Sequence, residues 1–416
     1  MQAIIKQGVA AKAAASRLMT CSSKSKNDAL TAIADALIAN KQTILDANAL
    51  DMRNARENGM TEALLDRLML DSARIDAIAK GIMEVVSQYD PIGQVEKMQV
   101  RPNGLMIGRK TVPLGVIAII YEARPNVTVD AAILCLKAGN AVILRGGKEA
   151  FNSNNAFTEI MRSAISKAGL PEDSVSLVQD TSRESVDALF NLTDYVDVLI
   201  PRGGAGLIRH VSLNSKVPII ETGVGNCHIY VAETADLAMA AKIVFNGKCR
   251  RPSVCNATET LLVDRAVAEA FLPMAKELLD TKKTELRGCA ETVKILGDCV
   301  TPASDDDYYT EFLDYILAVK VVAGIDEAIA HISKYGSKHS ESIVTNDYTA
   351  SQRFLNEVDA AAVYVNAPTA FTDGGEFGLG AEIGISTQKM HARGPMGLDQ
   401  LTSTKFIIYG NGQIRG

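Results

Sequence analysis

Leu114-Gly-Val-Ile-Ala-Ile-Ile120 is a continuous apolar run with the length of one β-strand. A strand without alternating polar residues is buried on both faces, as in parallel sheets that helices cover on both sides. Helix-like stretches separate several comparable apolar runs, which lie at 141–145, 175–178, 195–200, 217–220 and 228–231. Alternating strands and helices predict an α/β domain of the nucleotide-binding type with a parallel sheet.

Upstream of this run, apolar residues recur at three- and four-residue steps from about residue 23 to residue 87. This spacing predicts amphipathic helices. Residues 96–111 alternate in polarity and turn at Asn103-Gly104, a dipeptide that suits a tight β-hairpin. Such a projecting ribbon is compatible with a subunit contact and with an ordinary surface hairpin.

Downstream, a second α/β unit extends to about residue 388. Its strand-like runs lie at 258–263, 292–296, 315–322, 342–345 and 361–365. A last strand at 401–409 could pair with the earlier hairpin or with a second subunit. We therefore predict three parts: a nucleotide-binding domain at 1–231 from which the hairpin 96–111 projects, a second α/β domain at 232–388, and a C-terminal strand element at 389–416.

The second unit contains a cysteine-bearing loop, NGKCRRPSVCNA at 246–257, immediately before the strand-like run 258–263. Cationic neighbours such as Lys248 stabilise a thiolate, and a loop leaves it accessible, which are the two requirements of a cysteine nucleophile. Cysteines are more often small buried apolar side chains. The loop residues alone leave Cys255 and Cys249 as alternative nucleophiles.

A glycine-rich turn, Pro201-Arg-Gly203-Gly204-Ala-Gly206, follows a predicted strand and opens a predicted helix. Glycines at a helix N-terminus let a phosphate group approach the backbone amides. Gly203 and Gly204 are therefore candidate cofactor-binding residues. The turn lacks the G-x-G-x-x-G spacing, and a glycine turn without a ligand is the alternative.

Composition excludes several functional classes. The 416 residues have a formal net charge of −6 and no strongly basic block, so nucleic acid is not an expected partner. Five histidines and seven cysteines lack the paired spacings of a metal site. The sequence also predicts neither a leader peptide nor a membrane span. An odd number of cysteines, one of them a candidate nucleophile, suggests the reducing cytoplasm.

Five motifs together resemble one enzyme family. They are YEARPNVT at 121–128, ETGVGNCH at 221–228, RPSVCN at 251–256, VAGIDEAIAHISKYGSKHSESI at 322–343 and ARGPMG at 392–397. They resemble the glutamate-5-semialdehyde dehydrogenases, or γ-glutamyl phosphate reductases, of the aldehyde dehydrogenase superfamily, over nearly the whole chain. The resemblance implies an aldehyde dehydrogenase-like α/β fold in which 96–111 and 389–416 form a small β oligomerisation element.

The resemblance also assigns catalytic roles. Cys255 matches the catalytic cysteine of the superfamily, whereas Cys249 has no counterpart. Asn126 matches the asparagine whose amide, with a backbone N–H at the cysteine, holds the oxyanion. Glu221 lies where hydrolytic relatives keep the base that activates water, and a reductase has no use for that water, so its role stays open.

For the cofactor, the resemblance points to Arg145 and Lys148. NAD-using relatives carry a lysine and, three residues later, a glutamate that binds the adenine ribose. Here the second position is Lys148, which would attract the extra phosphate of NADP, so we predict NADPH. Glu311 falls near the position that binds the nicotinamide ribose, although the residues that flank it depart from the superfamily pattern.

The implied reaction is NADPH-dependent reduction of L-glutamyl 5-phosphate to L-glutamate 5-semialdehyde and phosphate, through a thioacyl intermediate on the cysteine. It is the second step of proline biosynthesis from glutamate. Arg124, Arg251 and Arg393 are candidates for the substrate's anionic groups. Glutamate 5-kinase and further copies of the chain are the implied partners. A hydrolytic NAD-dependent aldehyde dehydrogenase and a non-catalytic nucleotide-binding protein are the alternatives.

Overall fold

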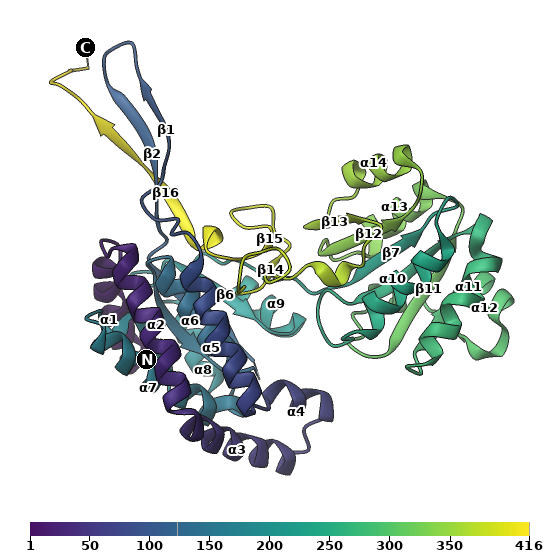
Figure 1. Ribbon diagram of the computed structural model, residues 1–416, viewed down its shortest axis with the longest axis horizontal. Coiled ribbons are helices and arrows are strands. Elements are labelled where there is room, and N and C mark those ends of the chain that lie inside the picture. Colours follow the sequence, from purple (N-terminus) through teal and green to yellow (C-terminus); the bar gives the residue numbers. More distant parts are fainter. Residues whose placement is uncertain (123, 416) are drawn as a thin grey trace. The chain divides into compact units, whose positions relative to one another are not determined.

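The computed structural model describes residues 1–122 and 124–415. Ala123, inside the motif at 121–128, and Gly416, at the end of the predicted C-terminal element, lie outside the described residues. The chain forms two compact units (Figure 1). Unit 1 comprises 1–222, 378–384 and 396–416, and unit 2 comprises 223–377 and 385–395. The sequence predicts the change of domain after residue 231.

Unit 1 contains a four-stranded parallel sheet with the order β5-β4-β3-β6. Its strands are β3 (Val116–Tyr121), β4 (Ala141–Arg145), β5 (Val175–Leu177) and β6 (Val198–Arg202). Every residue of β3 is buried, as its apolar sequence predicts. The run at 217–220 forms only an isolated bridge from Ile219 to Leu199, because Pro218 has no N–H for a regular ladder.

Helices make up most of the rest of unit 1. They are α1 (Gln2–Leu18), α2 (Ser23–Ala39), α3 (Lys41–Glu57), α4 (Glu62–Leu68), α5 (Ser72–Ser87), α6 (Pro125–Lys137), α7 (Phe151–Lys167), α8 (Arg183–Phe190) and α9 (Ala205–Asn214). The helical region predicted between 23 and 87 is confirmed, with breaks such as the one at Asn40. The apolar spacing does not predict α1, because alanines fill much of its buried face.

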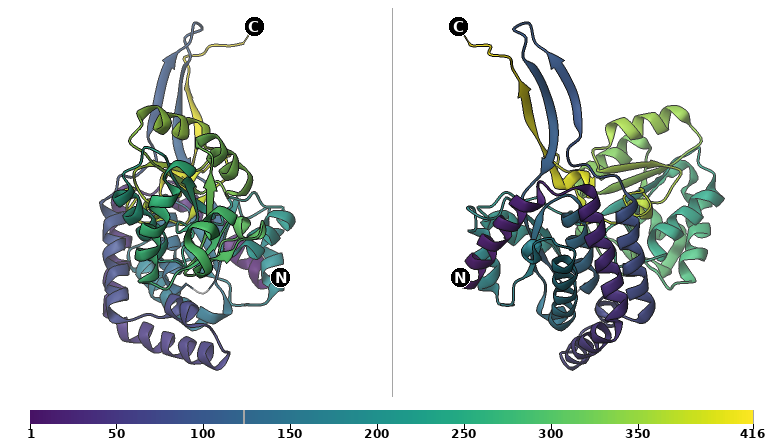
Figure 2. Two further views of the ribbon diagram at one scale, coloured as in Figure 1. Left: turned by 90° about the vertical axis from the view of Figure 1, so that its right-hand side faces the viewer. Right: turned by 60° about the vertical axis from the view of Figure 1, so that its left-hand side comes forward.

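A separate antiparallel sheet of unit 1 consists of β1 (Val95–Val100), β2 (Met106–Pro113) and β16 (Thr402–Tyr409), in the order β1-β2-β16. Both views in Figure 2 show these strands as a ribbon that extends away from the helices of unit 1. Gly104 has φ +86°, as the predicted hairpin turn requires. β16 pairs with β2 from Thr402 opposite Pro113 to Tyr409 opposite Met106, so the tail pairs with the hairpin.

Unit 2 contains a seven-stranded parallel sheet with the order β10-β9-β11-β8-β7-β12-β13. The strands are β7 (Cys227–Val231), β8 (Thr258–Asp264), β9 (Glu285–Gly288), β10 (Thr301–Pro302), β11 (Ile316–Val322), β12 (Ser340–Val344) and β13 (Ala362–Val365). The helices are α10 (Leu237–Cys249), α11 (Arg265–Asp280), α12 (Ala290–Leu296), α13 (Ile325–Tyr335) and α14 (Tyr348–Glu357).

Two expectations for this region need correction. β7 pairs with β8 and β12, so residues 228–231 belong to the sheet of unit 2 and not to that of the first domain. The predicted strand at 292–296 is wrong, since these residues lie in helix α12 and the strand is β9. A short apolar run does not distinguish a strand from one face of a helix.

Unit 2 also contains a short antiparallel pair, β14 (Ile385–Ser386) and β15 (Gly394–Pro395). Among the described residues, no helix combines the length and the apolar character that a membrane crossing would need.

Candidate active site

The two cysteines of the loop have different environments. Cys249 is the last residue of α10, its exposed fraction is 4%, and its Sγ lies 3.5 Å from Thr284 Oγ1. Burial raises the pKa of the Cys249 thiol. Cys255 lies in the turn between α10 and β8 and is partly exposed. Of the two, Cys255 has the accessibility that a nucleophile needs.

A glycine-containing segment crosses the backbone of this turn. A Cβ atom on Gly225 would lie 1.5 Å from the carbonyl oxygen of Cys255, so only glycine fits there. Two residues later, the Cys227 thiol donates a hydrogen bond to the same oxygen, with an Sγ–O distance of 3.3 Å. The Gly225 N–H donates to Glu311 Oε1 at 2.8 Å. Glu311, which the resemblance places near the nicotinamide ribose, thus holds the segment that packs on the Cys255 backbone.

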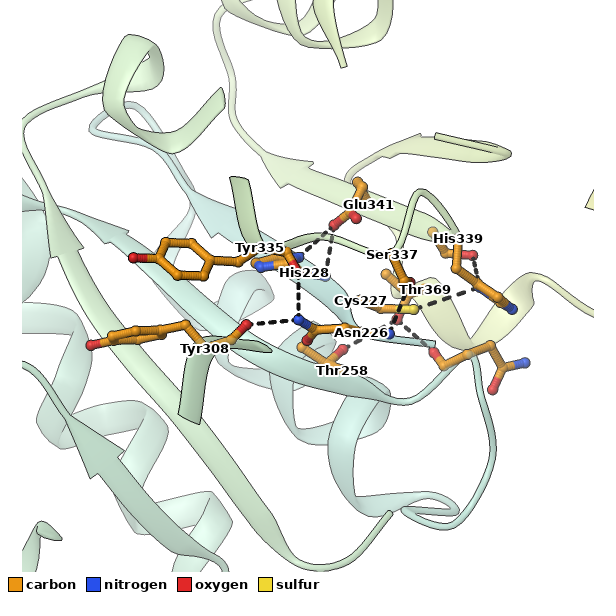
Figure 3. A network of polar contacts seen from close by, with 12 residues as sticks. Asn226, Cys227, His228, Thr258, Tyr308, Tyr335, Ser337, His339, Glu341 and Thr369 are labelled. Atoms are coloured by element: carbon orange, nitrogen blue, oxygen red, sulfur yellow. Dashed lines mark hydrogen bonds and ion pairs between the residues drawn. The ribbon is translucent and has the colours of Figure 1, made fainter. Parts of the chain in front are cut away.

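Figure 3 shows the polar network around the start of β7. The Asn226 amide donates to the carbonyls of Tyr308 and Tyr335, at 2.7 and 2.8 Å. Glu341 accepts hydrogen bonds from the backbone and from the ring of His228, at 2.8 and 2.9 Å. Tyr335 and Glu341 belong to the motif at 322–343. This motif therefore anchors the strand that follows the segment packed on the Cys255 backbone.

The lysine expected to stabilise the thiolate is engaged elsewhere. Lys248 Nζ lies 2.5 Å from Glu259 Oε2, and both side chains have an exposed fraction of 0%. Burial lowers the pKa of Lys248 and raises the pKa of Glu259 to about 7. Lys248 is therefore paired with Glu259 of β8. Arg251, the cation closer to Cys255 in the loop, is exposed.

Arg393 also has a partner inside unit 2. Its Nη2 donates to Asp359 Oδ1 at 2.7 Å, and Asp359 further pairs with Lys389 and Lys338. Hydrogen bonds from Lys389 and Arg393 lower the pKa of Asp359 to about 2. An anionic substrate at Arg393 would compete with this carboxylate.

Asn126 lies in the first turn of α6, where Pro125 opens the helix and Arg124 is the half-buried N-cap. Asn126 Nδ2 donates to Asp130 Oδ2 at 3.0 Å. Burial raises the pKa of Asp130 to about 6, against the lowering effects of this hydrogen bond and of the Arg202 charge. The Asn126 side chain is therefore held in one orientation by its own helix.

Glu221 also belongs to unit 1 and is half-buried. Its Oε1 accepts a hydrogen bond from the Ser212 hydroxyl of α9, with an O–O distance of 2.6 Å. A carboxylate that holds a hydroxyl in this way fits a structural role at least as well as the role of a base.

Unit 1 contains a cavity of about 780 Å³ at the carboxyl ends of its strands. Its lining includes Glu122 after β3, Lys148 after β4, Arg183 at the start of α8, and Gly206 after β6. The order β5-β4-β3-β6 makes the β3–β6 boundary the point where the chain reverses its direction across the sheet. Open α/β sheets bind ligands at such a point.

The residues predicted to bind the cofactor differ in their availability. Lys148 is exposed at the cavity. Arg145 also lines the cavity, but its guanidinium donates to the carbonyls of Thr181 and Ser182, at 2.6 and 2.8 Å. It therefore holds the segment before α8.

The glycine turn at the start of α9 binds an anion within unit 1. The Gly204 N–H donates to Glu122 Oε2 at 3.0 Å, and a side chain on Gly203 would collide with the same carboxylate. The carboxylate takes the place in which the sequence predicts a cofactor phosphate. This arrangement agrees with the anion preference of a helix N-terminus.

The sequence alone did not indicate four residues with these contacts: Glu122, Asp130, Gly225 and Cys227. Gly225 and Cys227 lie in the quoted motif 221–228, where a glycine beside a candidate site indicates a close backbone approach. Asp130 follows Asn126 by one helical turn, a spacing that brings side chains together. No local sequence pattern connects Glu122 with Gly204, because Glu122 follows β3 and Gly204 follows β6.

Comparisons with known proteins agree with this architecture. The model of the aldehyde dehydrogenase family matches residues 2–294. A γ-glutamyl phosphate reductase of Clostridium novyi is 58% identical over 99% of both chains, and one of Carboxydothermus hydrogenoformans is 57% identical over the full length of both. The crystal structure of the Thermotoga maritima γ-glutamyl phosphate reductase is 48% identical, covers 99% of both chains and superposes with a TM-score of 0.95.

A more distant structure, an engineered glycolyl-CoA reductase with bound NADP⁺, is 18% identical and has a TM-score of 0.69 over 97% of this chain and 95% of its own. At that identity it supports the fold alone. The predicted aldehyde dehydrogenase-like fold is confirmed, and so is the resemblance on which it depends. The chain is an oxidoreductase that belongs to the aldehyde dehydrogenase family and, within it, to the γ-glutamyl phosphate reductases.

Proposed function

We propose that the protein reduces L-glutamyl 5-phosphate to L-glutamate 5-semialdehyde and phosphate with NADPH, as the second step of proline biosynthesis. The observation that carries the proposal is the 57–58% identity, over the full length, to relatives named γ-glutamyl phosphate reductase. A reducing cytoplasm is the proposed location, because a nucleophilic thiol stays reduced there.

In the proposed mechanism, the Cys255 thiolate attacks the γ-carbonyl carbon of the acyl phosphate. The C–S bond forms, the C–O bond to phosphate breaks, and inorganic phosphate leaves. The partial exposure of Cys255 and the burial of Cys249 support this choice of nucleophile. Asn126, with a backbone N–H at the cysteine, would donate hydrogen bonds to the oxyanion.

Bound NADPH would supply the hydride that reduces the resulting thioester to the aldehyde. The cavity of unit 1 fits a dinucleotide, because it lies at the switch point of a parallel sheet. Lys148 would attract the 2′-phosphate of NADPH, and a bridging phosphate at the Gly203-Gly204 turn would displace the Glu122 carboxylate from the Gly204 amide. Contact of Glu311 with the nicotinamide ribose stays a prediction.

For the substrate, we propose that Arg251 and Arg124 bind its phosphate and α-carboxylate, and that Arg393 contributes if Asp359 releases it. We propose a structural role for Glu221, which the Ser212 hydroxyl holds. Glutamate 5-kinase is the proposed supplier of the unstable acyl phosphate.

The reverse reaction tests the proposal without a supply of the unstable acyl phosphate. With glutamate semialdehyde and NADP⁺, turnover should require inorganic phosphate, because phosphate must cleave the thioester. Turnover that is indifferent to phosphate would instead identify a hydrolytic aldehyde dehydrogenase. Cys255→Ala should abolish turnover, while Cys249→Ala, the matched control, should leave it nearly unchanged. Full activity in Cys255→Ala would rule out the proposed nucleophile.

The choice of cofactor has its own test. Lys148→Glu should lower the preference for NADPH over NADH by at least about tenfold, since a charge reversal near a phosphate is worth at least the roughly 1.4 kcal/mol of a tenfold change. Lys167→Glu, at the exposed end of α7, is the control. Equal preference ratios in wild type and Lys148→Glu would remove Lys148 from the cofactor site.

A further inference from the structure

The hydrogen bond between Asn126 and Asp130 spans one turn of α6. Asn126 Nδ2 donates to Asp130 Oδ2 at 3.0 Å. An asparagine side chain can turn its amide by half a rotation and exchange its oxygen for its nitrogen. A carboxylate accepts hydrogen bonds and does not donate them, so it selects the nitrogen side. One N–H of Asn126 then points to Asp130, and the second N–H remains for another acceptor.

Asp130 is half-buried on a helix whose other residues are mostly buried. Most residues of α6 are buried, including Val127, Thr128, Val129 and 131–137. Burial penalises the charged form of the Asp130 carboxyl group. The charge of Arg202, at the end of β6, offsets part of this penalty, and Arg202 itself pairs with Glu382 at 3.8 Å. A leucine at this position would avoid the cost.

We propose that Asp130 is a positioning residue for Asn126: it holds the amide so that the second N–H is presented to the substrate oxygen as that oxygen gains negative charge. The inference rests on the oxyanion role proposed for Asn126 above. An oxyanion donor acts by being oriented before the reaction, so an amide free to turn would contribute less.

The first variant removes the acceptor. Asp130→Leu should lower kcat of the phosphate-dependent reverse reaction by about tenfold, which is a part of the roughly 100-fold loss expected for removal of an oxyanion donor in Asn126→Ala. The KM values for NADP⁺ and glutamate semialdehyde should change less than about twofold, because Asp130 is proposed to act in the transition state. Thermal unfolding checks that Asp130→Leu is folded.

The second variant separates positioning from packing. Asp130→Asn keeps an oxygen that can accept from Asn126, so it should recover most of the lost kcat. If Asp130→Asn is as slow as Asp130→Leu although both are folded, positioning through the acceptor is wrong. Unchanged kcat in Asp130→Leu would also overturn the proposal.

A double-mutant comparison shows whether Asp130 acts through Asn126. In the Asn126→Ala background, Asp130→Leu should change kcat by less than about twofold. An undiminished tenfold loss in that background would mean that Asp130 acts independently of Asn126. If Asn126→Ala itself is as active as wild type while Cys255→Ala is inactive, then the oxyanion role fails, and the positioning role with it. An impaired Asn126→Ala beside an unimpaired Asp130→Leu would overturn the positioning role alone.

Discussion

At the scale of single residues, the environment of each candidate decides what its chemical type can do. Cys249 and Cys255 lie six residues apart in one sequence stretch, yet Cys249 ends helix α10 and is buried, whereas Cys255 lies in the following turn and is partly exposed. Lys248 and Arg145 are cations near their expected sites, but each is already bound, by Glu259 and by backbone carbonyls. Residue type and spacing predict where reactive groups lie along the chain. They do not predict which groups have other partners.

Gly225 gives a prediction at this scale. Gly225→Ala should strongly reduce both turnover and the rate at which iodoacetamide alkylates Cys255, because the new methyl group would overlap the Cys255 carbonyl group and displace the turn. Activity assays and mass spectrometry of the alkylated protein measure the two effects. Gly81→Ala is the control, since nothing lies within 4 Å of its added carbon. Normal alkylation and turnover in Gly225→Ala would contradict the described close approach.

At the scale of elements, the buried pair of Lys248 and Glu259 joins α10 to β8, on either side of the cysteine turn. Lys248→Met should lower the free energy of unfolding by about 3–5 kcal/mol, because it leaves a buried carboxylate without its cation. The double variant Lys248→Met/Glu259→Leu should recover most of the loss. Denaturant unfolding measures both values. Equal losses in the single and the double variant would show that packing, and not charge pairing, is responsible.

Elements with a strong local pattern could be predicted from the sequence. β3 and β4 are continuous apolar runs, and Asn103-Gly104 specifies its own turn. Elements with a weak pattern could not be predicted. Alanines make up much of the buried face of α1, and α12 contains only a short apolar run. The placement of β7 in the second sheet depends on its pairing with β8 and β12, which no local property of its sequence reveals.

The candidate site could also be predicted only in part from the sequence. The cysteine loop and Asn126 could be located because their motifs are contiguous, whereas the role of each side chain depends on distant partners. Glu122 meets Gly204, and Gly225 meets Cys255, through the packing of segments that are far apart in sequence. Asp130 is the exception, since its partner lies on the same helix and the spacing alone would have suggested it.

At the scale of the whole molecule, the sheet β1-β2-β16 carries exposed apolar side chains. Phe406 and Ile408 on β16 have exposed fractions of 71% and 59%. Exposed apolar groups on an extended sheet are typical of a subunit contact. We therefore expect the protein to form an oligomer through this sheet.

Phe406→Lys/Ile408→Lys should reduce the particle mass measured by light scattering, because four-carbon cationic side chains would replace the apolar contact. Leu213→Lys, on α9, is the control, since Leu213 is equally exposed but lies outside this sheet. An unchanged mass in the double variant would place the subunit contact elsewhere or show that none exists.

The insertion of unit 2 between β2 and β16 has a consequence for biosynthesis. On the ribosome, β2 emerges long before its partner β16, with all of unit 2 in between. The roughly 290 intervening residues take about 15–60 s to translate. Throughout that interval one edge of β2 in the nascent chain has no partner strand. Such an edge can pair with another chain, so this stage of synthesis is prone to aggregation.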